Sequence, residues 1–222
     1  MSRGPVRTMA GLTAPMLRFP WLGPLTPPWW SRMAAAYELV ARTGLTHHRP
    51  AYGIDRVRVG DREIAVREES ADQTPFGTLL HFRKDLDLAQ PRVLLVAPMS
   101  GHFATLLRGT VRTMLPEHDV YVTDWHNARD VALEHGAFGF DDFIDHVIRF
   151  LESMGPESHV VAVCQPCVGV LAAVAVMAQA DNPAVPRSMT LMAGPVDTRV
   201  NPTRVNELAT SHSIEWFRRH LI

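Results

Sequence analysis

The sequence predicts an α/β protein in which a mostly parallel sheet carries helices on both faces. Short apolar runs read as buried strands, at residues 93–97, 120–123, 160–164 and 189–193. Segments of helical character separate these runs, at residues 103–115, 142–153 and 168–179. Strands that alternate with helices imply right-handed crossovers, and ligands then bind at the carboxyl ends of the strands.

The remaining elements are read from local patterns. Residues 54–66 alternate with period two around a Gly60-Asp61 turn, which predicts a hairpin, and residues 78–82 supply another strand. The helix at 142–153 has apolar side chains at helical spacing and Asp141 as its expected N-cap. The helix at 168–179 is apolar all round, so we expect it to be the central buried helix.

Two regions are expected along the chain, residues 1–50 and residues 51–222. Proline and tryptophan crowd the first 31 residues, and proline at this density predicts an irregular arm, followed by a short helix at 31–42. Exposed tryptophans seek apolar partners. The arm either packs on its own domain or contacts another subunit, as in a homo-oligomer, or an apolar surface.

Composition excludes several functional classes. The formal net charge of the 222 residues is −1 and no basic block stands out, so neither nucleic acid nor an anionic membrane is indicated as a partner. The most apolar stretch, residues 160–180, contains Gln165, Pro166 and Gly169, so no membrane span is expected. The absence of a secretion signal and of a long disulfide framework favours a cytoplasmic setting.

Cys167 is the predicted nucleophile. The run Gln165-Pro166-Cys167-Val168-Gly169 stands between a strand and a helix, where hydrolases place Gly-x-Ser-x-Gly on a sharp turn. The amide of Val168 would then face the attacked carbonyl. The alternative for Cys167 is a small inert core residue. Cys164 falls within the predicted strand and is expected to be buried and structural.

A second turn follows the strand at 93–97. In hydrolases of this kind that turn supplies another oxyanion-binding amide, here from Met99 or Ser100. The turn could equally be a plain connection with Ser100 capping the next helix. His102 follows directly and is read either as a pocket residue or as an ordinary loop histidine.

Polar residues at two further strand ends complete the predicted pocket. Asp124 and Trp125 end the second strand, and Asp197 follows the fourth, where some hydrolases carry a catalytic acid. The alternatives are structural: Asp124 pairs with an arginine in the long loop, and Asp197 forms a turn with Arg199. We expect no metal and no cofactor.

With these motifs placed, the sequence resembles the intracellular polyhydroxyalkanoate (polyhydroxybutyrate) depolymerases of the α/β-hydrolase superfamily. Four stretches carry the resemblance: VLLVAPMSGHFATLLRG (93–109), YVTDWHNARD (121–130), VCQPCV (163–168) and SMTLMAGP (188–195). Residues 51–222 would be the N-terminal part of such a domain, and we expect the fold to be incomplete at its C-terminus.

The resemblance implies thiol-mediated hydrolysis of poly-3-hydroxybutyrate, with the storage granule surface as the partner and the site of localisation. The family's nucleophile works with an aspartate and a histidine that come later in the chain. After Asp197 we find no matching acid or base, because His212 and His220 lie in or beside a predicted helix at 214–222. Activity is therefore expected to be impaired.

Three other functions stay open. A polyhydroxyalkanoate synthase-like acyltransferase would use the same fold and the same elbow cysteine. A thiol oxidoreductase would use Cys164 and Cys167 as a Cys-x-x-Cys pair. A non-catalytic granule-associated protein would need neither thiol.

Overall fold

The computed structural model describes residues 4–17, 28–42, 48–100 and 103–221. They divide into two compact units, Met1–Arg49 and Pro50–Ile222. The first unit holds two helices in contact, α1 (Gly4–Leu17) and α2 (Pro28–Arg42). The prediction of an irregular arm is therefore wrong for residues 4–17, which form α1 with Pro15 inside the helix.

Small residues allow the two helices of the first unit to approach closely. Ala10 and Ala34 are buried, and a Cβ on Gly11 would lie 3.9 Å from the Cβ of Ala41. α2 also begins earlier than predicted. Pro28 occupies its first position, where proline is well tolerated because the missing N–H would have no helical acceptor.

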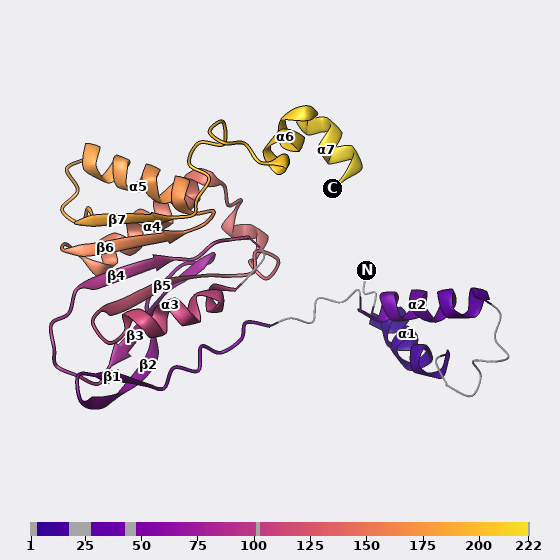
Figure 1. Ribbon diagram of the computed structural model, residues 1–222, viewed down its shortest axis with the longest axis horizontal. Coiled ribbons are helices and arrows are strands. Elements are labelled where there is room, and N and C mark those ends of the chain that lie inside the picture. The colour runs from indigo at the N-terminus through magenta and orange to yellow at the C-terminus, as the bar shows by residue number, and fades with distance from the viewer. Residues whose placement is uncertain (1–3, 18–27, 43–47, 101–102, 222) are drawn as a thin grey trace. The chain divides into compact units, whose positions relative to one another are not determined.

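The second unit is built on a seven-stranded sheet in the order β1-β2-β3-β5-β4-β6-β7 (Figure 1). The strands span Arg56–Val59 (β1), Arg62–Gln73 (β2), Gly77–Lys84 (β3), Arg92–Val96 (β4), Asp119–Trp125 (β5), Ser158–Val163 (β6) and Ser188–Met192 (β7). β1, β2 and β3 pair antiparallel, as does β3 with β5, whereas β4 pairs parallel with β5 and β6, and β6 with β7. The mostly parallel sheet and its hairpin confirm the predictions.

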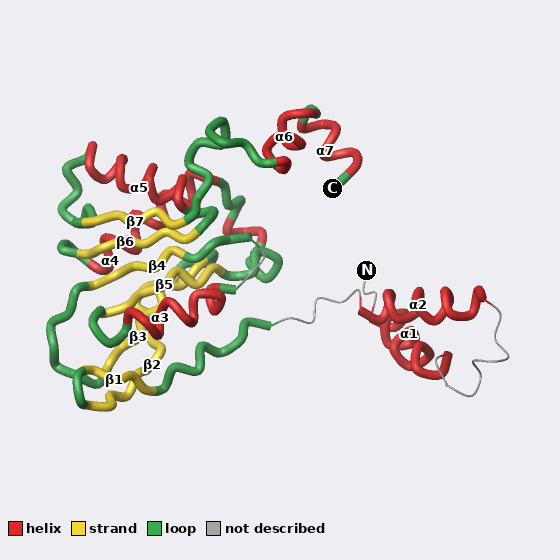
Figure 2. The backbone as a smooth tube through the Cα atoms, in the orientation of Figure 1, coloured by secondary structure: helices red, strands yellow, loops and turns green. Residues whose placement is uncertain are grey.

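Helices cover both faces of this sheet (Figure 2). One face packs against α4 (Phe140–Met154) and α5 (Cys167–Gln179), around Leu94, Phe150 and Met177. The other face packs against a 3-10 turn, η2 (Ala104–Leu107), and α3 (Arg108–Met114). The predicted α/β class, a sheet with helices on both faces, is confirmed.

Two details differ from the prediction. The N-cap of α4 is Gly139 and not Asp141, because the Gly139 amide donates to the Asp142 carboxylate at 2.7 Å. α5 is not buried on all sides: Leu171 is 37% exposed and Val176 49% exposed. An apolar outer face therefore remains on this helix, although its inner face packs on the sheet and on α4.

Short elements complete the second unit. A 3-10 turn, η3 (Leu133–His135), lies in the long connection before α4. Two helices follow β7, namely α6 (Arg204–Ser211) and α7 (Ile214–His220). Among the described residues, none of the helices is long and apolar enough to cross a membrane.

The strand order reverses between β4 and β6. From β4 the chain moves to β5 on one side, and later returns to the other side of β4 through β6. In open α/β sheets, ligands bind outside the carboxyl ends of the strands at such a reversal. The residues that follow β4 and β6 therefore define the region in which a site is expected.

Candidate active site

Cys164 occupies the sharp turn between β6 and α5. It is exposed, and its backbone has a positive φ of 68°. Its amide donates to the carbonyl of Met192 at 2.8 Å, and its carbonyl accepts from the amide of Cys167 at 3.2 Å. A residue other than glycine rarely adopts such a φ. A strained residue of this kind, placed between a strand and a helix, is the geometry in which hydrolases present a nucleophile.

Cys167 has the opposite environment. Its side chain is 0% exposed and belongs to the core beneath α5. The sulfur lies 3.5 Å from the carbonyl oxygen of Ala162 and 3.6 Å from that of Met192. Desolvation raises the pKa of the Cys167 thiol, which lowers its thiolate fraction and thus its nucleophilicity.

The sequence predicted a buried Cys164 and a Cys167 exposed on the turn, and both predictions are wrong. The sequence places Cys164 in the strand and Cys167 at the bend, but β6 ends at Val163 and Cys167 is the first residue of α5. Pro166 was the missed signal. Proline favours the first position of a helix or the residue beside it, so the bend has to come before it.

The turn after β4 faces this bend. The amide of Met99 donates to the side-chain oxygen Oε1 of Gln165, at 2.7 Å. The two predicted turns are thus joined across the reversal of the strand order, and the Met99 amide points toward the residue that follows Cys164. Gln165 had no assigned role in the sequence, because its part depends on this contact across the sheet.

Two side chains of β5 fix the start of that turn. The amide of Ala97 donates to Oγ1 of Thr123 at 2.9 Å, and Nε1 of Trp125 donates to the carbonyl of Ala97, also at 2.9 Å. Thr123 is fully buried. Trp125, which was predicted to line a pocket, is half-buried and packs among aromatic rings, with its ring centroid 5.0 Å from that of Phe143.

The other predicted site residues lie on different elements. Ser100 is exposed, Val168 is half-buried in the first turn of α5, and His102 lies outside the described residues. Asp124 is half-buried in β5, opposite Thr78 of β3.

Asp197 forms the structural turn that was its alternative interpretation. Both of its carboxylate oxygens accept from the Arg199 guanidinium at 2.9 Å. This ion pair lowers the pKa of the Asp197 carboxyl.

No general base is assigned among the residues that the structure describes. His126 contacts Oγ1 of Thr78 and the carbonyl of Pro75, at 2.8 and 2.9 Å. His212 and His220 contact backbone carbonyls of their own segments. Within residues 48–100 and 103–221, no imidazole or carboxylate is hydrogen-bonded to the sulfur of Cys164.

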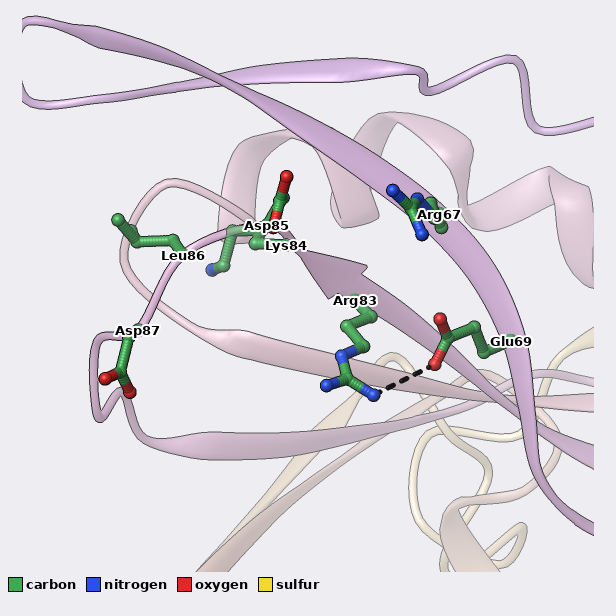
Figure 3. Close-up of a pocket in the computed structure, with 7 residues that line it drawn as sticks. All are labelled: Arg67, Glu69, Arg83, Lys84, Asp85, Leu86 and Asp87. Atoms are coloured by element: carbon green, nitrogen blue, oxygen red, sulfur yellow. Dashed lines mark hydrogen bonds and ion pairs between the residues drawn. The ribbon is translucent and has the colours of Figure 1, made fainter.

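A cavity of about 550 Å³ has neither cysteine among its lining residues, which Figure 3 shows as sticks. Its lining residues are Arg67, Glu69, Arg83, Lys84, Asp85, Leu86 and Asp87. The C-terminal end of β3 lies beside the start of β5, since Phe82 pairs with Val120, so this cavity is at the amino ends of the parallel strands. Arg83 is tied to Glu69 at 3.5 Å, and Lys84 donates to the carbonyls of Leu115 and His118. We regard the cavity as separate from the candidate site.

Comparison with known proteins gives no match to a protein-family model and no match to a curated protein sequence. Solved structures do match. Naproxen esterase (carboxylesterase NP) from Bacillus subtilis is 15% identical with a TM-score of 0.40, over 57% of this chain and 42% of its own. A predicted CIB-like hydrolase from Thermoplasma acidophilum is 13% identical with a TM-score of 0.39, over 59% and 64%. A 2-hydroxy-6-oxo-6-phenylhexa-2,4-dienoate hydrolase from Rhodococcus sp. strain RHA1 is 13% identical with a TM-score of 0.37, over 59% and 46%. The match spans less than two thirds of the length of each of these structures.

Proposed function

We propose that this chain belongs to a thiol esterase in which Cys164 attacks the carbonyl carbon of a polyhydroxyalkanoate ester. One observation carries the proposal: the exposed thiol sits on a strained turn with φ of 68°, between β6 and α5. The turn also lies where the strand order reverses, at the place where such sheets bind ligands. This assignment replaces Cys167 by Cys164 and retains the chemistry expected from the sequence.

The reaction follows from the groups around the turn. The sulfur of Cys164 would bond to the carbonyl carbon, and the carbonyl oxygen would take up the negative charge. The amides of Met99 and Gln165 are the candidate donors to that oxygen, one from each turn. The thiol proton would pass to solvent, and collapse would break the ester C–O bond, so that the alkoxide leaves, takes a proton from solvent and a thioester remains on Cys164. Water would then hydrolyse this thioester, which releases the hydroxy acid and restores the thiol.

An aliphatic polyester suits the surroundings of the turn. Met99 is 36% exposed and is bonded to Gln165, and Met192 is 46% exposed and pairs with Val163, directly before Cys164. Flexible thioether side chains adapt to irregular apolar surfaces. Together with the four sequence stretches that resemble the depolymerases, these residues support a storage granule as the substrate and partner.

The experiment is hydrolysis of amorphous poly-3-hydroxybutyrate by the purified full chain. We expect slow release of 3-hydroxybutyrate, because no imidazole or carboxylate of the described residues is hydrogen-bonded to the Cys164 sulfur. Release should be lost in Cys164→Ala and retained in the matched variant Cys167→Ala. Peptide mapping should place the acyl group on Cys164. Release that survives Cys164→Ala would refute the proposal, and polymer formed from 3-hydroxybutyryl-CoA would favour the synthase-like alternative.

A further inference from the structure

The hydrogen bond between Met99 and Gln165 has a consequence for substrate entry. The donor is the backbone amide that faces the turn of Cys164, and the acceptor is the carbonyl oxygen of a carboxamide, at 2.7 Å. Amide and ester carbonyl oxygens are alike in shape and in acceptor directions. The side chain of Gln165 therefore fills the position that the oxygen of an acyl substrate would need at this amide.

Moving the Gln165 side chain away from the Met99 amide costs little free energy. The side chain is exposed, so water replaces the amide as the partner of its oxygen. An oxygen that develops negative charge accepts hydrogen bonds about twice as strong as those of a neutral carbonyl. The transition state of acyl transfer therefore displaces the carboxamide, while a neutral ester in the ground state competes with it on nearly equal terms.

Two other hydrogen bonds hold the start of the turn and do not involve Gln165. Ala97 is held on both sides by β5, through Oγ1 of Thr123 and Nε1 of Trp125. Both of these anchors come from a buried or half-buried strand of the sheet. Because these two hydrogen bonds hold Ala97 without Gln165, we treat the Gln165 side chain as a group that occupies the Met99 amide and not as its support.

We propose that the Gln165 carboxamide is an intramolecular competitor of the substrate: its oxygen occupies the oxyanion-binding amide of Met99 until an acyl carbonyl oxygen displaces it. The inference rests on the proposed function, since it assigns the carbonyl of a Cys164-directed ester as the displacing group. Gln165 thus has two separate roles, because its backbone amide serves the oxyanion while its side chain opposes substrate entry. Only the second role responds to a side-chain substitution.

The test compares two reactions of Cys164 in the full chain, followed by mass spectrometry with peptide mapping. p-Nitrophenyl acetate acylates the thiol. The sulfur bonds to the carbonyl carbon while the π electron pair of the C=O bond moves to the carbonyl oxygen. When that pair forms the C=O bond again, the bond to p-nitrophenolate breaks. The thiol proton passes to the buffer. Iodoacetamide alkylates the same thiol by displacement of iodide, forms no oxyanion, and so corrects for changes in exposure or thiolate content.

We expect Gln165→Met, which keeps the length of the side chain and removes its acceptor, to raise the ratio of acylation to alkylation by about 2- to 10-fold, the factor of one net hydrogen bond. Gln165→Glu should lower the ratio at pH 8 by at least a similar factor, because a carboxylate binds the amide more strongly. The Met99 amide should exchange its hydrogen faster in Gln165→Met.

The outcomes separate the two proposals. An unchanged or lowered ratio in Gln165→Met, with acetyl groups on Cys164, would overturn the competitor role and leave the nucleophile in place. Alkylation without acetylation of Cys164 in every variant, the parent included, would overturn the proposed function and the competitor role together.

Discussion

Gly194 lies directly over the sulfur of Cys167. A Cβ on this glycine would come within 2.3 Å of Sγ and 2.2 Å of Cβ of that cysteine, far inside contact distance. The residue follows β7 and Ala193, whose φ is 53°, so the chain turns sharply back over the start of α5. The closure explains why Cys167 is sealed in the core while Cys164, three residues earlier, remains exposed.

The two thiols should therefore differ in reactivity in the folded protein. We expect iodoacetamide to label Cys164 within minutes at pH 8, and Cys167 only after denaturation, because burial both blocks access and raises the pKa of the Cys167 thiol. Time-resolved peptide mapping measures the two rates. Equal labelling of both cysteines in the native protein would contradict the structure.

Gly169 should be intolerant of any side chain. A Cβ there would lie 2.5 Å from the Phe143 ring of α4, so α5 and α4 approach closely at this glycine. We expect Gly169→Ala to lower the free energy of unfolding by about 1–3 kcal/mol, measured by urea denaturation. The matched control is Gly109→Ala in α3, where, apart from its chain neighbours and the backbone of its own helix, no described atom lies within 4 Å of the added Cβ. That variant should be unchanged or more stable by up to about 1 kcal/mol.

Thr123 should matter for both stability and acylation. Replacing it by valine keeps its shape but removes the acceptor for the Ala97 amide, which stays buried. We expect Thr123→Val to lower the free energy of unfolding by about 1–3 kcal/mol and to slow acylation of Cys164, because the Met99 turn loses an anchor. Thr190→Val, at an exposed position of β7, is the control and should change neither quantity. A neutral Thr123→Val would show that the anchor is dispensable.

Asp72 should make stability depend on acidic pH. It lies at a register shift between β2 and β3, where Nε of Arg149 donates to it at 2.7 Å and Nη2 at 2.8 Å. These hydrogen bonds lower the pKa of Asp72 in the folded protein. Its contribution is therefore complete above the unfolded pKa of about 3.9 and is lost as the pH falls through the lower folded value.

A double-mutant cycle with Asp72→Asn and Arg149→Ala measures this contribution. We expect a coupling of up to about 1 kcal/mol at pH 7, because the Arg149 side chain is largely exposed and solvent screens the pair. The coupling should decrease as the pH falls through the lowered folded pKa of Asp72. A coupling that does not change as the carboxylate is titrated would contradict the ionic origin of the effect.

Local patterns sufficed for most of the elements. The apolar runs at 93–97, 160–164 and 189–193 became β4, β6 and β7 with boundaries shifted by one or two residues, as is usual for the ends of elements. A shift of one residue at the end of β6 decided the interpretation of the site. Moving the end of β6 from Cys164 to Val163 exchanges which cysteine occupies the turn and which begins the helix.

Periodicity and alternation by themselves determined the α/β class, the parallel arrangement after residue 92 and the turns at which chemistry collects, because each depends on local spacing of apolar residues. Only the tertiary structure decided that Cys164 is exposed, that Gly194 covers Cys167 and that Gln165 reaches the Met99 amide. These relationships join residues about 30 to 70 positions apart or depend on a backbone angle, and no local pattern encodes them.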